Sequence, residues 1–397
     1  VLQFTDKCNA LCPQCGMRAK NKFERKTLRS EKIMQIIKHA GDQKVSALSF
    51  TGGEPLLYFD ELVNYIQYAG ECGIKYIRTG TNGFMFMNNE SAGYKDKIKR
   101  MAEKLAQTDL YTFWISLDSA DAKLHEKMRG LKNVVKGIEK ALPILHDFGI
   151  YPAANLGINR NTGGYNKELY EMAKDEKKFS HDTFYETFKE SFSKFYNFVI
   201  DLGFTITNAC YPMSLDPSDD SNLNAVYTAT SEDLLIKFTK KEKIPMFQAL
   251  FDTIPQYRSK VRIFTPLSSL YHVIEEHKGS NNKSYPCRGG IDYFFIDSKD
   301  GNTYPCGYRG EDNFGDFSNL NISKVPNKAH CKECDWECFR DPSTLLGPLM
   351  HPTSIISKLW SDRTFLKILL KDLFYYKSCN HFNGRLQPNY DALKKYK

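Results

Sequence analysis

The first fifteen residues, VLQFTDKCNALCPQC (residues 1–15), join a short apolar segment to three closely spaced cysteines. Val1–Thr5 is predicted to be a strand, and Cys8, Cys12 and Cys15 follow it so closely that one loop can bring three thiols together. Iron-sulfur clusters normally take four thiolates, so three would leave one iron open to a ligand. The alternative is a zinc site of three cysteines and a histidine, but no histidine lies near in the sequence.

Beyond this stretch, short apolar runs alternate with longer amphipathic stretches as far as about residue 210, which is typical of βα units and a parallel sheet. The predicted strands are Val1–Thr5, Ala47–Thr51, Tyr76–Thr79, Thr112–Leu117, Tyr151–Leu156 and Phe204–Asn208. The predicted helices are Ser30–Ala40, capped by Ser30, and Tyr58–Gly70, Tyr94–Gln107 and Asn133–Phe148. Six units predict an α/β fold, a partial (β/α)6 TIM-like barrel, with its chemistry at the carboxyl ends of the strands.

Three domains or segments follow from these patterns. Residues 1–215 form the predicted barrel, with a helical insertion at about 159–195, and residues 216–286 form a linker and a helical segment. Residues 287–397 form a small cysteine-rich domain. In it, Tyr293–Ile296 and Asn302–Tyr304 flank an Asp-Gly turn and predict a hairpin that returns Cys306 towards Cys287.

Composition limits the other possibilities. The chain has 397 residues, and Lys and Arg exceed Asp and Glu by 55 to 47, a net charge of +8. The basic residues are scattered, which favours a solvated surface and makes a nucleic-acid partner unlikely. No stretch reaches the roughly 18 to 20 apolar residues that a membrane helix needs, and no signal peptide is recognised, so we expect a cytoplasmic protein. Eleven cysteines in that compartment are expected to be reduced, and Cys72 and Cys210 to be buried core thiols.

The second predicted strand ends in Ser49-Phe50-Thr51-Gly52-Gly53-Glu54-Pro55, about 40 residues after the cysteines. Paired glycines allow a close backbone approach to a ligand. With the cysteine spacing, this segment resembles the cluster and Gly-Gly-Glu-Pro motifs of the radical S-adenosylmethionine (radical SAM) superfamily. The resemblance implies a 4Fe-4S cluster on Cys8, Cys12 and Cys15, and cofactor contacts from Gly52, Gly53 and Glu54.

Further matches follow in the order that this family shows. Thr81-Asn82-Gly83 ends the third strand, Ser116-Leu117-Asp118 ends the fourth, and His125 to Gly130 is similar to a His-Asp-x-x-Arg-Gly segment. The residues that these matches assign to the cofactor are Asn82, Ser116, Asp118 and Arg129, with Asn155 at the end of the fifth strand as a further candidate. One position departs from the family: Gln14 stands where an apolar or aromatic residue is common near adenine.

The resemblance also implies the chemistry. The open iron binds S-adenosylmethionine and reduces it, which gives methionine and a 5′-deoxyadenosyl radical that abstracts hydrogen from a substrate carbon. The expected result is oxidation, cross-linking or epimerisation of a peptide, a protein or a small metabolite, with a flavodoxin or ferredoxin-type electron donor. The alternative is a non-catalytic iron-sulfur electron-transfer or cluster-carrier protein.

A second cysteine cluster resembles the SPASM and Twitch extensions of this superfamily, which bind auxiliary 4Fe-4S clusters. The predicted ligands are Cys287, Cys306, Cys331, Cys334, Cys338 and Cys379. Six thiolates cannot complete two clusters, so we expect one auxiliary cluster, or two with open or non-cysteine positions. The alternative is a zinc knuckle at Cys331, Cys334 and Cys338 with His330 or Cys379.

Overall fold

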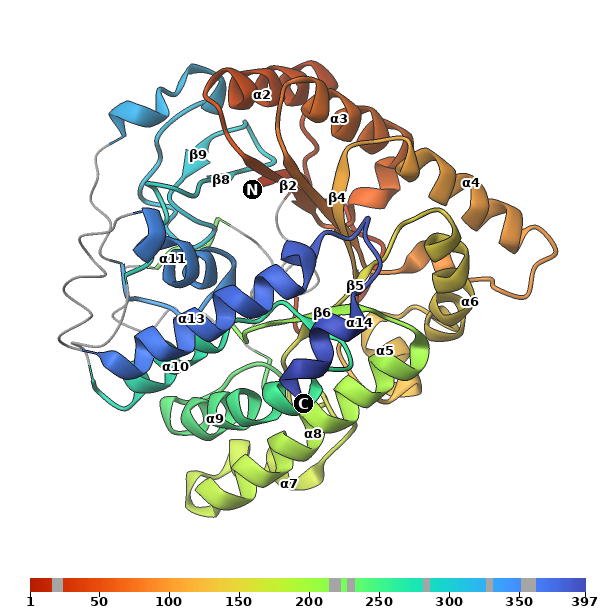
Figure 1. Ribbon diagram of the computed structural model, residues 1–397. Coiled ribbons are helices and arrows are strands. Elements are labelled where there is room, and N and C mark those ends of the chain that lie inside the picture. Colours follow the sequence, from red (N-terminus) through yellow and green to blue (C-terminus); the bar gives the residue numbers. More distant parts are fainter. Residues whose placement is uncertain (16–23, 214–222, 227–232, 281–285, 326–330, 351–361) are drawn as a thin grey trace.

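A single nine-stranded sheet forms the centre of the protein (Figure 1). The computed structural model describes residues 1–15, 24–213, 223–226, 233–280, 286–325, 331–350 and 362–397. The strands are β1 (Leu2–Thr5), β2 (Ala47–Gly52), β3 (Tyr76–Thr81), β4 (Leu110–Ser116), β5 (Ala153–Gly157), β6 (Ile206–Cys210), β7 (Arg262–Ile263), β8 (Phe295–Ile296) and β9 (Thr303–Tyr304). Their order is β7-β6-β5-β4-β3-β2-β1-β8-β9. Neighbours from β7 to β8 are parallel and β9 is antiparallel to β8, so the sheet forms a partial barrel.

Helices surround this sheet. The α-helices are α2 (Ser30–Asp42), α3 (Phe59–Glu71), α4 (Tyr94–Ala106), α5 (Ala122–Arg129), α6 (Val134–Asp147), α7 (Lys167–Lys174), α8 (His181–Leu202), α9 (Lys240–Tyr257), α10 (Leu267–His277), α11 (Glu337–Met350), α13 (Arg363–Ser378) and α14 (Tyr390–Leu393). Short 3-10 helices are η1 (Pro55–Tyr58), η2 (Phe84–Phe86), η3 (Glu176–Lys178), η5 (Phe317–Asn319), η6 (Ile322–Lys324), η7 (Asn380–Phe382) and η8 (Lys394–Tyr396).

Periodicity explains which face each element buries. Helix α2 buries Ile33, Ile36, Ile37 and Ala40, which is the spacing of one apolar stripe on a helix. Along a strand, successive side chains point to opposite faces. In β3, Ile77 and Thr79 are fully buried, while Arg78 and Gly80 line the central cavity. The alternation therefore divides each strand between the helical layer and the barrel interior.

The six predicted strands are present, with ends shifted by one or two residues, and the partial barrel is confirmed. The sheet extends beyond these six strands on both sides, because β7 pairs with β6 and β8 pairs in parallel with β1. The predicted hairpin is β8 and β9. The prediction of Ser30 as an N-cap is wrong: α2 begins at Ser30, and the cap position is Arg29, which makes no side-chain capping bond.

The region at about 159–195 contains α7, η3 and the first part of α8, so it is helical as predicted. Helix α8 continues to Leu202 and packs on α9, so it serves as the helix that connects β5 to β6. Before α7, Arg160 is fully buried and pairs with Glu242 of α9 at 2.9 Å. This ion pair fixes the loop after β5 to the helical layer.

The last part of the chain packs against the barrel at the amino ends of β4 and β5. The backbone N–H of Gly384 donates to the carbonyl of Tyr111, the second residue of β4. The N–H of Tyr151, just before β5, donates to the carbonyl of Gly384. The side chain of Arg385 donates to carbonyls at the ends of α4 and α6. Residues of α13 form an apolar cluster with residues of β5 and β6. The predicted domain boundary at residue 287 stays a prediction. Beyond that residue, β8 pairs with β1, and α13 packs on β5 and β6.

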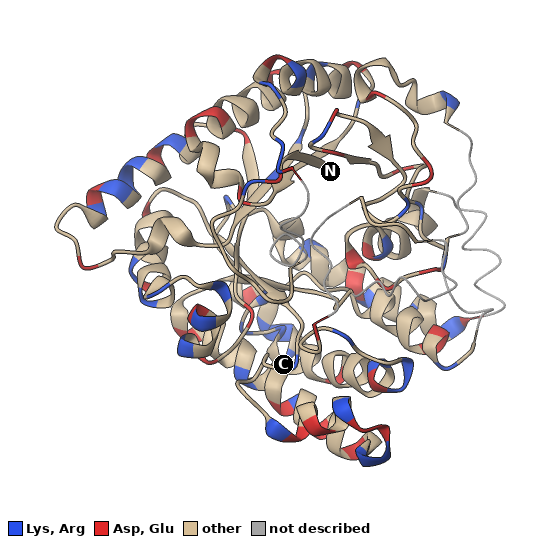
Figure 2. Ribbon diagram, turned by 180° about the vertical axis from the view of Figure 1, so that it is seen from behind, with Lys and Arg blue, Asp and Glu red and all other residues tan. Residues whose placement is uncertain are grey.

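Charged side chains of both signs are interspersed along the outer helices (Figure 2). Among the described residues, no helix combines the length and the apolar character that crossing a membrane requires.

Candidate functional site

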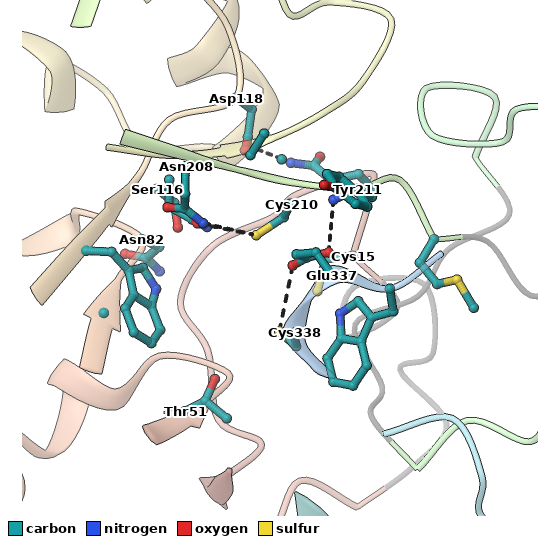
Figure 3. Close-up of a pocket in the computed structure, with 18 of the residues that line it drawn as sticks. Cys15, Thr51, Asn82, Ser116, Asp118, Asn208, Cys210, Tyr211, Glu337 and Cys338 are labelled. Atoms are coloured by element: carbon teal, nitrogen blue, oxygen red, sulfur yellow. Dashed lines mark hydrogen bonds between the residues drawn. The ribbon is translucent and has the colours of Figure 1, made fainter. Parts of the chain in front are cut away.

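A cavity of about 430 Å³ occupies the barrel interior. Residues from the ends of β2 to β6 line one side of it, and residues of α11 line another (Figure 3). All the predicted cofactor residues border this cavity, as do the three N-terminal cysteines: Cys8, Cys12, Cys15, Gly52, Gly53, Glu54, Asn82, Ser116, Asp118, Arg129 and Asn155. The fold therefore gathers into one place residues that are spread over about 150 positions of sequence.

The loop after β1 carries the three thiols. A turn bond of 3.1 Å from the N–H of Cys15 to the carbonyl of Cys12 curls the loop, and the N–H of Leu11 donates to the carbonyl of Arg129. The backbone of Ala10 and the side-chain amide of Asn82 both hydrogen-bond the Cys8 sulfur. Burial raises the pKa of Cys12 to about 12, against the opposing charge of Arg129. Donors aimed at a buried sulfur suit a thiolate that ligates a metal cluster.

Gly52 and Gly53 let the end of β2 meet this loop. The N–H of Gly53 donates to the carbonyl of Thr5, and that of Glu54 donates to Lys7, both at 2.8 Å. A Cβ atom on Gly52 would lie 2.4 Å from the Thr5 oxygen, and one on Gly53 would lie 2.3 Å from the Lys7 oxygen. The two glycines thus allow the backbone at the end of β2 to lie close to the backbone of Thr5 and Lys7. This approach fixes where the cysteine loop begins. The predicted contact of the two glycines with the cofactor stays a prediction.

Glu54 is fully buried and ties β2 to β3. One carboxylate oxygen accepts from the N–H of Leu56 at 3.0 Å, and the other accepts from the N–H of Asn82 at 2.6 Å. Burial raises the pKa of Glu54 to about 7, and these two hydrogen bonds oppose the rise. The side chain of Asn82 then reaches the cysteine loop, where it donates to Asn9 at 2.9 Å. Both residues border the cavity and brace the cysteine loop.

Asp118 and Arg129 form a buried pair. The guanidinium donates to both carboxylate oxygens, from Nε at 2.8 Å and from Nη2 at 2.9 Å. Burial opposes the charge of Arg129, but the neighbouring Asp118 raises the Arg129 pKa above its ordinary value. Gln14 donates to Asp118 at 2.7 Å, and its own Oε1 is buried without a partner among the described residues. The residue that departs from the family pattern thus completes a polar group with Asp118, which sequence reasoning missed.

His125 supports this pair from behind. Its Nδ1 accepts a hydrogen bond of 3.1 Å from the N–H of Asp118, so the ring is neutral and protonated on the other nitrogen. Burial, helped by the charge of Arg129, lowers the pKa of His125 to about 4. The imidazole therefore stays neutral over the physiological range and positions Asp118.

Ser116 and Asn155 lie at the ends of the neighbouring strands β4 and β5. Asn155 accepts from the thiol of Cys210 at 3.3 Å. Cys210 borders the cavity, so its prediction as a core thiol is only half right: burial raises its pKa well above the ordinary value, but its sulfur faces the polar interior of the barrel (Figure 3).

Four of the C-terminal cysteines converge. Cys287, Cys306, Cys331 and Cys334 line one small cavity that is separate from the barrel cavity. The backbones of Cys287 and Cys331 form a bridge, in which the N–H of Cys287 donates to the carbonyl of Cys331 at 3.1 Å. This arrangement supplies the complete set of four thiolates that one iron-sulfur cluster takes.

The sulfurs in this small cavity accept backbone hydrogen bonds in a repeated pattern. The N–H groups of Gly289 and Tyr308, each two residues after a cysteine, donate to Cys287 and Cys306 at 3.4 Å. The backbone of Trp336 does the same for Cys334. In the described part of the chain, no three His, Cys, Asp or Glu side chains are arranged around a single metal ion. A four-iron cluster is larger than one ion and holds its thiolates further apart, so the donor set fits a cluster better than zinc.

Cys338 and Cys379 do not join this group. Cys338 lies at the start of α11 and borders the barrel cavity, where its thiol donates to Glu337 at 3.7 Å (Figure 3). Cys379 is fully buried at the end of α13, in an apolar cluster with Tyr375 and Phe382. The structure therefore does not bring these two predicted ligands to the others. A zinc knuckle that needs Cys338 beside Cys331 is disfavoured for the same reason, and His330 lies outside the described residues.

Comparison with known proteins adds three findings. The model of the radical SAM superfamily matches residues 2–174. A probable GTP 3′,8-cyclase of Methanococcus maripaludis is 30% identical over 146 residues, which is 36% of this chain and 45% of that protein. One of Pyrococcus abyssi is 28% identical over 164 residues, 40% of this chain and 48% of that protein. The chain thus spans about half the length of the curated relatives that it matches.

Among solved structures, SuiB of Streptococcus suis, determined with S-adenosylmethionine bound, superposes with a TM-score of 0.52. The two chains are 19% identical, and the match covers 83% of this chain and 65% of SuiB. At this identity the likeness concerns the fold.

Proposed function

We propose that this chain, whose residues 2–174 match the radical SAM superfamily, cleaves S-adenosylmethionine reductively and uses the resulting 5′-deoxyadenosyl radical to take hydrogen from a substrate carbon. Cys8, Cys12 and Cys15 would hold the 4Fe-4S cluster. The observation that carries this proposal is the convergence of these three thiols at a cavity bordered by every other predicted cofactor residue. An enzymatic role replaces the alternative of a non-catalytic cluster carrier.

The residues around the cavity suit a polar cofactor. Gln14 has a buried carbonyl oxygen without a partner in the described chain, so it can accept a hydrogen bond from a bound amino group. Ser116 and Asn155 present polar side chains at adjacent strand ends. Arg129 uses Nε and Nη2 for Asp118, which leaves Nη1 to donate to a carboxylate. These donors and acceptors match the amino, carboxylate and hydroxyl groups of S-adenosylmethionine.

The task of these residues is to orient groups and to exclude water. Asp118 is held by Arg129, Gln14 and His125 together, so its position is fixed before any ligand arrives. The Gly52-Gly53 contact and the Glu54 bonds hold the cysteine loop against β2 and β3 in the same way. None of them needs to transfer a proton.

We also infer an auxiliary 4Fe-4S cluster on Cys287, Cys306, Cys331 and Cys334, which accepts or relays an electron. Four converging thiols support it, and so do the backbone N–H groups aimed at their sulfurs. A flavodoxin or ferredoxin-type protein would supply the electron that reduces the first cluster. The relatives named as probable GTP 3′,8-cyclases match 36% of this chain over 146 residues. We infer that the reaction is oxidation, cross-linking or epimerisation of a peptide, a protein or a small metabolite.

Anaerobic incubation of the reconstituted protein with dithionite and S-adenosylmethionine tests the proposal. We expect 5′-deoxyadenosine and methionine, measured by chromatography and mass spectrometry. Cys15→Ala should abolish both products, while Cys72→Ala, which alters a thiol at the end of α3, should leave them unchanged. An absence of 5′-deoxyadenosine from a protein with full iron and sulfide content, also in the presence of cell extract as a source of substrate, would contradict the proposal.

A further inference from the structure

Arg78 is a cation inside the barrel that has no role in the proposed cleavage of S-adenosylmethionine. It lies on β3, partly buried, and its side chain borders the cavity. The guanidinium carbon lies 5.2 Å from the ring centre of Trp114 and 5.5 Å from that of Phe264. Gly80 makes room for this arrangement, because a Cβ atom there would lie 1.9 Å from the Trp114 ring nitrogen. Two aromatic rings thus hold the guanidinium in place.

Aromatic rings stabilise the charge of an arginine but supply no acceptors for its five N–H donors. Among the described residues, none makes a hydrogen bond or ion pair with the Arg78 side chain. The other buried arginines of the barrel differ in this respect. Arg129, Arg160 and Arg258 pair with the carboxylates of Asp118, Glu242 and Asp372. Arg262 of β7 has no carboxylate partner among the described residues, but it donates to the carbonyls of Thr205 and Asn383 and to the Thr205 hydroxyl. Arg78 therefore presents unused donors to the cavity, in a place where buried polar groups are normally satisfied.

The acidic side chains across the cavity do not neutralise this charge. Glu337 accepts from the N–H of Tyr211 at 3.0 Å, and Asp341 accepts from the hydroxyl of Ser269 at 2.5 Å. Burial raises the pKa of both carboxyl groups. Both carboxylates bond to other groups, and neither pairs with the Arg78 guanidinium.

We propose that Arg78 binds an anionic group of the substrate, a carboxylate or a phosphate, through two parallel N–H bonds. This assignment rests on the proposed function and names its substrate class. A guanidinium fork matches an oxyanion with two acceptor oxygens, and the flanking rings exclude water from the pair. Arg78 precedes Asn82 by four residues, so at about 3.3 Å per residue it lies about 13 Å further down the strand. The anion would then lie deep in the barrel, with the rest of the substrate extending towards the cofactor end.

The first experiment measures whether anions protect Arg78 from phenylglyoxal, which modifies accessible guanidinium groups. The reconstituted holoprotein is treated anaerobically with pyrophosphate, with succinate, or with sodium chloride at the same ionic strength. Peptide mass spectrometry then gives the modification rate at Arg78 and at Arg100, an exposed arginine on α4 that serves as internal control. We expect pyrophosphate or succinate to slow modification of Arg78 at least fivefold and to leave Arg100 unchanged, and the stronger of the two identifies the anion class.

The second experiment measures binding of that anion by calorimetry. Arg78→Gln should weaken binding at least tenfold, Arg78→Lys should weaken it less because the charge remains, and Arg100→Gln should bind as the parent does. Thermal melting checks that each variant is folded, and Arg78→Lys carries the test if Arg78→Gln does not fold. Equal protection of Arg78 and Arg100, an unreactive Arg78, or unchanged binding in both Arg78 variants would each overturn the assignment.

Neither experiment requires reduction or cleavage of S-adenosylmethionine. A protein that forms 5′-deoxyadenosine but shows no anion binding at Arg78 would refute only this inference. A protein that binds the anion but forms no 5′-deoxyadenosine would refute the proposed function and leave the anion site standing.

Discussion

At the scale of single residues, the two glycines after β2 have a structural task that can be separated from ligand contact. Gly53 lies against the carbonyl of Lys7, and the same contact sets the start of the cysteine loop. A side chain at this position cannot be accommodated by a rotamer change, because the obstacle is backbone. The loop or the strand must move instead, and the three thiols move with the loop.

Gly53→Ala should therefore destabilise the protein and impair cluster binding together. We expect a loss of about 1–3 kcal/mol in the free energy of unfolding, as for other overpacked sites, and a lower iron content after reconstitution. Urea denaturation and iron quantification measure the two effects. Gly93→Ala is the matched control, since a Cβ atom there meets nothing within 4 Å and its φ is −87°. Full iron content in Gly53→Ala would show that the loop position does not depend on this contact.

His125 predicts a pH dependence of stability. Its pKa is about 4 in the folded protein and 6.5 ordinarily, because burial disfavours the charged ring. Between pH 6.5 and 4 the unfolded chain takes up a proton that the folded chain does not, so stability falls as the pH falls. The full contribution of His125 to the free energy of unfolding is on the order of 3 kcal/mol. Glu54, with its pKa raised to about 7, acts in the opposite direction, so the comparison must isolate His125.

His125→Asn isolates this effect, because the amide oxygen can still accept from the N–H of Asp118. We expect a smaller loss of stability between pH 6.5 and 4.5 in this variant than in the parent, as measured by urea denaturation midpoints. His181→Asn, which changes an exposed histidine at the start of α8, should keep the slope of the parent. Equal slopes in all three proteins would mean that the ring of His125 is protonated in the folded state.

At the scale of elements, the connection between β5 and α9 depends on one buried carboxylate. Glu242 pairs with Arg160 and also accepts from the N–H of Thr239, which completes the capping box at the start of α9. Arg160 in turn donates to the carbonyls of Leu234 and Lys237 and stacks on Phe238 at 4.3 Å. A single side chain thus links a strand end, a loop and a helix.

Glu242→Gln should cost about 3–5 kcal/mol of stability, because it leaves the buried guanidinium of Arg160 without its counter-charge. The exposed pair Lys38–Asp42 on α2 provides the control, and Asp42→Asn should not shift the unfolding midpoint measurably. Chemical denaturation followed by circular dichroism measures both. If Glu242→Gln were as stable as Asp42→Asn, the loop would be held by the carbonyl bonds of Arg160 alone.

At the scale of the whole molecule, the end of the chain returns to its beginning. Strand β8 pairs with β1, and the cysteines on either side of the β8–β9 hairpin meet at the second site. The proposed cluster at Cys8 and the proposed auxiliary cluster thus lie on segments that follow or flank the neighbouring strands β1 and β8. Such an arrangement suits electron transfer between the two, since both are fixed to the same rigid element.

Iron content can distinguish the cysteines that the structure gathers from those it leaves apart. We expect about eight irons per chain in the parent, four for each cluster. Cys334→Ala should lower this towards about four. Cys379→Ala, which changes a fully buried thiol in the apolar cluster at the end of α13, should keep the parent content. Iron and acid-labile sulfide assays check both variants, and about four irons in the parent would remove the auxiliary cluster from the proposal.

Local sequence was enough to predict the first six strands, the helices between them and the N-terminal cluster motif. Those features depend on periodicity and on spacing within one loop, which the order of residues determines directly. The resemblance to radical SAM motifs assigned Gly52 to Pro55 and Asp118 to one cofactor site, and both border the barrel cavity.

Only the tertiary structure decided which distant side chains meet. It added β7, whose two residues carry no recognisable period, and the pairing of β8 with β1, and it showed which C-terminal cysteines lie together. Cys287, Cys306, Cys331 and Cys334 converge, whereas Cys338 faces the barrel cavity and Cys379 packs among aromatic rings. The contacts of Gln14 with Asp118 and of Arg78 with Trp114 have the same origin. Spacing along the chain determines local geometry, but these pairings depend on how the chain closes on itself, and no local pattern encodes that closure.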